Sequence, residues 1–267
     1  MIAAPVVRGL GLLSGWGRGA AAIPGDAVVA AAGRRTVGLG RVSGPRYTGD
    51  RYRRTTRECL WALASVEAML EDVGAARETL AGDGTALVFV SAAVYAASNR
   101  AFIEGGGGST HFAYTAPAVV PAEVAIEFGL TGPSAIFIGG PPATLRAIWH
   151  AATLLAERAC DRVLVLAVET FAECEDLYET IRRRTPAPFV EASGCLWLEP
   201  GPGRLSLAPV SVPRRAMGAT VRRRIGETFA CEPLAAVALW RAAGCPGPLC
   251  LEGGWRGEAV RLAWEDA

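Results

Sequence analysis

Two short runs of the chain, residues 85–91 (TALVFVS) and 162–168 (RVLVLAV), are almost continuously apolar. A strand that is apolar at nearly every position must be covered on both faces, which is typical of the inner strands of α/β proteins. Segments with helical periodicity alternate with these runs. The sequence therefore predicts an α/β layered fold with a mostly parallel sheet.

The rest of the chain continues this alternation. Apolar residues recur at helical spacing over residues 55–73, and Gly74 is a suitable helix stop. Pro141 and Pro142 suit the first turn of a helix, which we expect to run to about residue 159. Further helices are expected at 121–128 and 229–243, and further strands at 6–13, 135–138, 195–198, 205–212, 249–252 and 260–264. Pro209 places the strand at 205–212 at a sheet edge.

Composition excludes several classes of function. Hydrophobic residues make up 51% of the 267 residues, enough for a large core, and the formal net charge is only +1. A nearly neutral chain gives no electrostatic reason to expect nucleic-acid or membrane binding. No apolar run reaches the roughly 18 residues of a membrane helix, and the apolar start of the chain fits a strand better than a signal peptide. We expect a cytoplasmic protein.

The cysteines and histidines do not form a metal-binding pattern. None of the seven cysteines is part of a Cys-x-x-Cys pair, and the histidines are His111 and His150. We therefore expect no metal and no cofactor, and interpret the cysteines as small buried residues in a reducing compartment. Both histidines are interpreted as structural or surface residues.

Several motifs, in their order along the chain, resemble those of the β-ketoacyl synthases, which have the thiolase-like fold. VVRGLGLLSGWG is similar to the family's first strand and glycine loop, and GLTGPSAIFIGG to its Gly-Pro-Ser turn and the strand leading to the nucleophile. LRAIWHAATLLAERACDRVLVLAVET resembles the nucleophile helix and the next strand, and CLWLEP the strand that closes the first half. GETFACEPLAAVALWRAA and GGWRGEAVRL resemble the Gly-His-Thr helix and the Gly-Phe-Gly-Gly turn of the second half.

This resemblance implies a single β-ketoacyl synthase-like domain over residues 1–267, with helices around mostly parallel or mixed sheets. The first half, 1–199, carries the Gly-Pro-Ser element. The second half, 200–267, is much shorter than in full-length synthases.

The catalytic positions depart from the family pattern. Active members hold a Cys at the start of a helix, where the helix dipole and backbone N–H groups favour a thiolate and an oxyanion. That position falls on Pro141, which has neither a nucleophile nor a backbone N–H. One family His falls on Glu227, and the other has no counterpart because no His follows His150. We therefore expect no catalytic residue at these positions.

The resemblance extends to the chain-length factors, which lack the nucleophile and pair with an active synthase as a heterodimer. It implies a non-catalytic subunit of polyketide, polyene or fatty-acid-type chain elongation, with a Cys-bearing ketosynthase as partner. Substrates would arrive on an acyl carrier protein. The pairing interface is expected at Ala135, Ile136, Phe137 and Ile138. Tyr95 and Phe102 are candidates for limiting product length at the partner's tunnel, and ordinary core positions are the alternative.

Two other classes of function remain open. A stand-alone acyl-thioester transferase or hydrolase would use Cys174 as a displaced nucleophile, or Glu227 through water. The acidic neighbours Glu173, Glu175 and Asp176 argue against Cys174, since they would raise its thiol pKa. The other class is a homodimeric scaffold or lipid-binding protein without a synthase partner.

Two arginine runs form local basic patches at 182–184 and 222–224. Short Arg clusters suit an acidic acyl carrier protein, although solvated surface runs explain them equally well. Nucleic-acid binding fits less well, because no aromatic residues lie within the runs.

Overall fold

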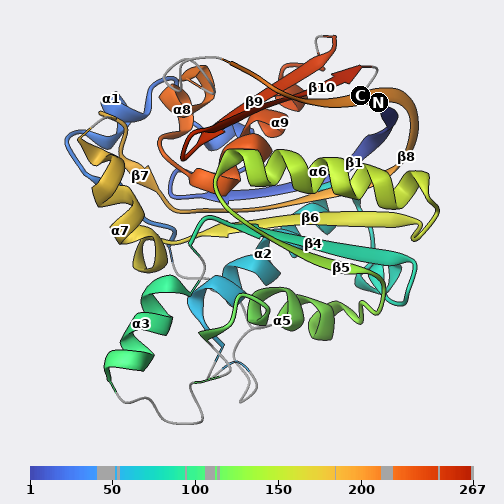
Figure 1. The fold of residues 1–267 in the computed structure, drawn as a ribbon, viewed down its shortest axis with the longest axis horizontal. Helices are drawn as coiled ribbons and strands as arrows, with labels where there is room; N and C mark the ends of the chain where they lie inside the picture. The colour runs from blue at the N-terminus through green and yellow to red at the C-terminus, as the bar shows by residue number, and fades with distance from the viewer. Residues whose placement is uncertain are drawn as a thin grey trace.

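A mixed eight-stranded sheet forms the centre of the protein (Figure 1), in a computed structural model that describes residues 1–40, 52, 55–93, 95–105, 112, 115–183, 185–211, 219–245 and 247–265. The strand order is β2-β1-β8-β6-β4-β5, and a hairpin of β9 and β10 joins through β8. A separate small sheet pairs β3 (Thr36–Val37) with β7 (Phe189–Val190).

The sheet is parallel only on one side. The strands β4 (Thr85–Ser91), β5 (Ser134–Ile138) and β6 (Arg162–Glu169) run parallel to one another. All other pairings in this sheet are antiparallel, including β1 (Ile2–Ser14) with β2 (Gly17–Arg18). The expectation of a mostly parallel sheet is therefore wrong, whereas an α/β fold with a mixed sheet is confirmed. The strand direction changes next to β6, because the segment that follows β6 and its next helix returns as a strand antiparallel to β6.

The strands expected at 195–198 and 205–212 are one continuous strand, β8 (Ala192–Pro209). It pairs along one side with β1, and along the other with β6 and then with β10. Gly201 lies within this strand because the backbone of β1 approaches it closely: a Cβ there would lie 2.7 Å from the Ala4 carbonyl oxygen. The division expected at 199/200 therefore falls inside β8.

The hairpin of β9 (Leu249–Trp255) and β10 (Glu258–Glu265) closes the chain. Its turn contains Arg256 and Gly257, both with positive φ (45° and 97°), as expected for a tight two-residue β-hairpin. The structure thus confirms two final strands, and β9 extends to Trp255, three residues beyond the expected end at residue 252.

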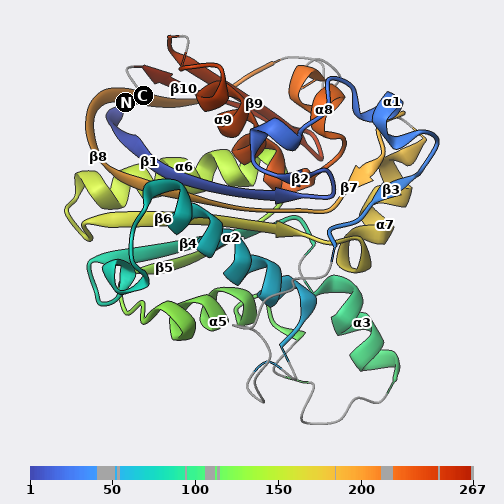
Figure 2. The same ribbon diagram turned by 180° about the vertical axis from the view of Figure 1, so that it is seen from behind.

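Helices cover both faces of the sheet (Figures 1 and 2). In the view of Figure 1, α6 (Pro141–Ala156) and α9 (Glu232–Ala242) lie between the central strands and the β9–β10 hairpin, and α2 (Arg57–Val73) and α5 (Val119–Phe128) lie below the central strands. Two large apolar clusters fill these layers, one on the α6 side and one on the α2 side. No helix in the described part of the chain is both long and apolar enough to span a bilayer.

Four helices that the sequence did not predict lie around one end of the sheet (Figure 1). They are α1 (Ala27–Ala31), α3 (Ala96–Glu104), α7 (Phe171–Arg182) and α8 (Ala219–Ile225). Short 3₁₀ turns at Ala20–Ala22, Arg77–Leu80 and Phe229–Cys231 complete the described elements. Five of the cysteines are buried as expected, but Cys245 and Cys250 are exposed.

Candidate functional site

The start of α6 presents unusually few hydrogen-bond donors. Gly140 is its N-cap residue, and the buried Pro141 and Pro142 occupy the first helical positions. Proline has no N–H, so two of the free amides that a helix start normally offers are missing. The indole of Trp255 covers this end from β9, since a Cβ built on Gly140 would lie 2.6 Å from its ring atoms.

Glu227 is a buried acid held in place by its backbone. Its N–H donates to the Pro188 carbonyl at 2.8 Å, and its own carbonyl accepts the Val190 N–H at 2.9 Å. The carboxylate Oε1 accepts the N–H of Phe229 at 3.1 Å, while Oε2 lies 3.3 Å from Arg222 Nε. Glu227 is only 4% exposed, so its carboxyl depends on these partners rather than on bulk water.

Arg222 lies between Glu227 and a second buried acid, Glu232, whose Oε2 is 2.7 Å from an Arg222 nitrogen. Burial raises the pKa of Glu227, and it raises the pKa of Glu232 to about 8, with the charge of Glu227 adding to the effect. Burial also acts to lower the pKa of Arg222, but the charges of Glu232 and Glu227 outweigh it and leave that pKa raised. One guanidinium is thus shared by two buried acids, and burial disfavours the state in which both acids are charged.

A single pocket of about 720 Å³ brings the two substituted positions together. Pro141 and Glu227 both line it, along with Trp255 and the arginines 222, 223 and 256. Among the described residues that line it there is neither a His nor a Cys. His150 lies elsewhere, with its ring centroid 5.7 Å from that of Phe137, and His111 lies outside the described residues.

Cys174 is completely buried next to a carboxyl that sequence reasoning missed. Its thiol donates to Glu169 Oε2 at 2.9 Å, and Glu169 Oε1 accepts the N–H groups of Ala92 (2.7 Å) and Ala230 (3.2 Å). Burial raises the pKa of Glu169 to about 7. Burial, followed by the charge of Glu169, holds the pKa of Cys174 well above its usual value. This geometry disfavours a thiolate nucleophile.

The direction of the Cys174 pKa shift was predicted, but for a different reason. Sequence reasoning attributed it to the acidic residues 173, 175 and 176, whereas burial and Glu169 contribute most. The sequence did contain a feature that could have identified Glu169 as a site residue: it is a glutamate directly after the apolar run at 162–168, at the end of a buried strand. Nothing local in the sequence pointed to the contact of Glu232 with Arg222.

Neither gating candidate lines the pocket of Pro141. Tyr95 is 1% exposed, and its hydroxyl lies 2.7 Å from the Thr56 hydroxyl at the N-cap of α2. Burial raises the pKa of Tyr95. Phe102 is half-buried on α3. Its ring centroid lies 5.8 Å from that of Phe112, which is 65% exposed. Tyr95 thus has the environment of a core residue, and Phe102 belongs to a surface aromatic pair.

The segment expected to form the pairing interface is an edge strand. In the described sheet, β5 pairs only with β4. Ala135 and Phe137 pack against the core on the α6 side. Ile136 and Ile138 point the other way and are 40% and 57% exposed. An edge with free backbone groups and exposed isoleucines is suited to accept another strand.

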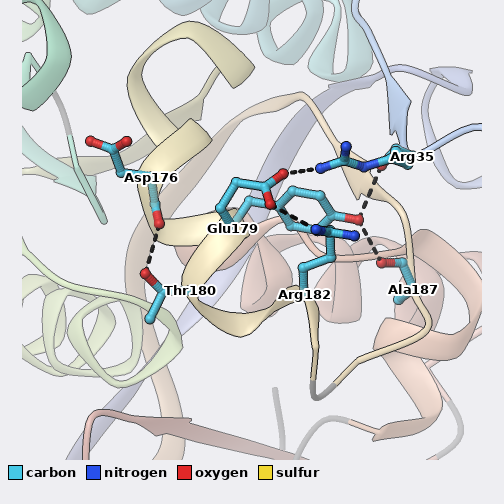
Figure 3. Close-up of polar contacts among 7 residues, drawn as sticks. Arg35, Asp176, Glu179, Thr180, Arg182 and Ala187 are labelled. Atoms are coloured by element: carbon cyan, nitrogen blue, oxygen red, sulfur yellow. Dashed lines mark hydrogen bonds and ion pairs between the residues drawn. The ribbon is translucent and has the colours of Figure 1, made fainter.

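The arginine runs carry less free charge than expected. Arg182 and Arg35 both pair with Glu179 on α7 (Figure 3), and Arg222 belongs to the buried cluster. Arg223 pairs with Asp26 at 3.0 Å. The Nε of residue 224 donates to a backbone carbonyl, and residue 184 lies outside the described part of the chain.

Comparisons with known proteins agree with this architecture. Residues 45–188 match the N-terminal domain of β-ketoacyl synthases. A search of curated proteins returns no match. Among solved structures, the fold is similar to AntDE:AntF, a type II PKS acyl-carrier protein in complex with its ketosynthase, with a TM-score of 0.78, 15% identity and full coverage of both chains.

Two further structures share the fold. The ishigamide ketosynthase/chain length factor matches with a TM-score of 0.71, 16% identity and 98% coverage of each chain. A ketosynthase in complex with its chain length factor from Xenorhabdus doucetiae matches with a TM-score of 0.55 and 15% identity, over 85% of this chain and 84% of the other.

Proposed function

Because the chain belongs to the β-ketoacyl synthase family, we propose that it is a non-catalytic, chain-length-factor-like subunit that pairs with an active ketosynthase. The observation that carries this proposal is the buried Pro141-Pro142 start of α6. A helix that begins this way supplies neither a sulfur nucleophile nor the first amides that would stabilise an oxyanion. Bond formation would then take place on the partner's Cys.

The pocket supports the same proposal. Glu227 stands where the resemblance places a His, and it is ion-paired with Arg222 within the buried cluster. A carboxylate held in this way cannot offer the neutral N–H donor of an imidazole to a thioester oxygen. We propose that the cluster has a structural role and that the chain is one domain over residues 1–267.

The exposed edge of β5 supports the pairing. An apolar strand with unsatisfied backbone groups is costly in a protein that stays alone, and a partner strand would cover it. We propose that Ala135, Ile136, Phe137 and Ile138 form the centre of a heterodimer interface. Phe102 and its neighbours on α3 are proposed to contact the partner near its acyl tunnel, and Tyr95 to fix the start of α3.

An acyl carrier protein is proposed as the source of the growing chain. The AntDE:AntF structure contains such a carrier with its ketosynthase, and a chain of that structure has a fold similar to that of this chain. The arginines add little support, because most of those in the described runs are paired within the protein. The carrier is therefore expected to dock mainly on the ketosynthase subunit.

Co-expression tests this proposal. The chain is produced alone and together with a Cys-bearing ketosynthase encoded near its gene, and elongation of an acyl thioester on the carrier protein is measured. We expect a heterodimer, with product only when both subunits are present. A Cys→Ala change in the ketosynthase should abolish product.

The rival functions give different results. Turnover of an acyl thioester by this chain alone, lost in Cys174→Ala or Glu227→Gln, would identify a stand-alone transferase or hydrolase. A monodisperse homodimer that ignores the ketosynthase would favour a scaffold. The complete burial of Cys174 is the observation that disfavours the first rival.

A further inference from the structure

The pocket beside Pro141 has a fixed apolar wall. The Trp255 indole packs on Gly140 and meets the Phe229 ring edge-on, with centroids 5.4 Å apart. Phe229 in turn lies 5.5 Å from Phe189, so aromatic rings continue from the pocket into the core. Pro141 and Ile181 add further apolar surface to the lining of the pocket. A volume of about 720 Å³ is typical of sites that enclose a small organic molecule.

The cations around this pocket are not equivalent. Arg222 is neutralised by the buried glutamates, and Arg223 by Asp26. Within the described residues, Arg256 takes part in no ion pair; it is exposed at the hairpin turn, with its guanidinium 5.7 Å from the Trp255 ring centroid. Among the described side chains that line the pocket, one positive charge is therefore uncompensated, directly beside the apolar wall.

We propose that this pocket binds a free apolar monocarboxylate of medium chain length. Its carboxylate would pair with Arg256, and its hydrocarbon chain would lie along Trp255 and Pro141. One unpaired guanidinium matches one negative charge, and a planar guanidinium suits a carboxylate in particular. The two prolines at the start of α6 offer no amide to a thioester oxygen, so a free acid fits better than a thioester.

This inference goes beyond the proposed function, because a heterodimeric partner subunit needs no ligand of its own. A free acid is also the chemical class that hydrolysis of an elongated acyl thioester would release. Occupancy of the pocket would then make the subunit responsive to that product class. Binding can be measured on the isolated chain, whether or not a ketosynthase partner is found.

The test is equilibrium dialysis of the full-length chain with decanoate, decanol and decanoyl-pantetheine. We expect saturable binding of decanoate at a single site, with decanol and the thioester at least about tenfold weaker, because neither can form the charge-assisted pair with Arg256. Trp255→Phe keeps the apolar wall but should lose any change in tryptophan emission caused by decanoate, which locates the site.

Variants of Arg256 separate charge from shape. Arg256→Gln should weaken decanoate binding about tenfold and leave decanol unchanged, whereas Arg256→Lys should weaken it less than Gln does, because Lys keeps the charge but loses the planar guanidinium. Arg8→Gln, an exposed arginine on β1, is the matched control and should have no effect. The proposal is overturned if decanoate does not bind saturably, if decanol or the thioester binds as well, or if Arg256→Gln behaves like the control.

Discussion

At the scale of single residues, Arg222 is the cation that compensates two buried acids. It lies between Glu227 and Glu232, which are 4% and 2% exposed. Glu232 Oε1 has no hydrogen-bond partner among the described residues, so the acid depends strongly on Arg222. Removing one partner from a buried ionic group leaves the others uncompensated, which costs much more than the intact group contributes.

We therefore expect Arg222→Ala to lower the free energy of unfolding by about 3 kcal/mol or more at pH 7.5, measured by urea denaturation. Arg223→Ala is the matched control, because its pair with Asp26 is exposed and screened by solvent, so its loss should change stability little. Equal losses in the two variants would show that the buried cluster does not depend on Arg222.

A second residue-scale prediction concerns Pro141. Restoring a thiol with Pro141→Cys should not produce an acyl-enzyme, because Pro142 still withholds an amide and no described residue lining the pocket is a His. Incubation with an acyl thioester followed by intact-protein mass spectrometry checks this. A stoichiometric acyl adduct on Cys at position 141 would contradict the account of a disarmed site.

At the scale of elements, one glycine sets how closely α2 approaches the sheet. A Cβ on Gly11 of β1 would overlap the carbonyl oxygen of Ser65 and the backbone nitrogen of Met69, both in α2. We expect Gly11→Ala to push the helix outward and to lower the free energy of unfolding by roughly 2 kcal/mol. Gly25→Ala, where a Cβ would meet no atom within 4 Å, is the control and should change stability little.

The β5 edge gives the second prediction at this scale. Ile138→Lys should prevent pairing with the ketosynthase, because a charge would enter an apolar interface, while the isolated chain keeps its circular dichroism and melting temperature. Val29→Lys is the control, since Val29 is 77% exposed on α1, away from β5. Size-exclusion chromatography of the co-expressed subunits measures the outcome, and an unchanged heterodimer would exclude this edge as the interface.

The elements also show what the sequence could predict. The strands β4 and β6 and the helix α2 follow from local apolar patterns, and their predicted positions agree with the structure to within two residues. The continuity of β8 was missed because Gly201 looks like a loop residue, although its role depends on the non-local approach of β1. The helix α7 was missed because charged residues interrupt its apolar pattern and only three of its residues are buried.

The candidate site divides in the same way. The resemblance located Pro141 and Glu227, and the structure brings both into one pocket. The ion pairs of Glu227 and Glu232 with Arg222 depend on how α8 and α9 pack together. The contact of Trp255 with Gly140 depends in the same way on how β9 packs against α6. Some of these contacts join segments that are distant in sequence. Others involve surface elements, such as α8, whose positions cannot be predicted from local sequence patterns.

At the scale of the whole molecule, the buried glutamates should determine how stability depends on pH. Burial raises the pKa of Glu169 to about 7 and that of Glu232 to about 8, and it also raises the pKa of Glu173 and Glu227. A raised pKa in the folded state means that the folded protein holds protons which the unfolded chain releases. Their stabilising effect is complete below the unfolded pKa near 4.5 and is lost as the pH rises through 7 and 8.

We therefore expect the free energy of unfolding to fall between pH 5.5 and pH 8.5, with Glu169 alone accounting for a loss on the order of 2 kcal/mol. Glu169→Gln mimics the protonated acid: its carbonyl can accept the N–H groups of Ala92 and Ala230, and its amide can donate to Ser91. Urea denaturation across this range should give a flatter profile for the variant than for the wild type. Glu175→Gln, exposed on α7, is the control and should leave the slope unchanged. A wild-type stability that rises over this range would mean that hydrogen bonds to the ionised Glu169 outweigh its burial, and that the carboxyl is charged at neutral pH.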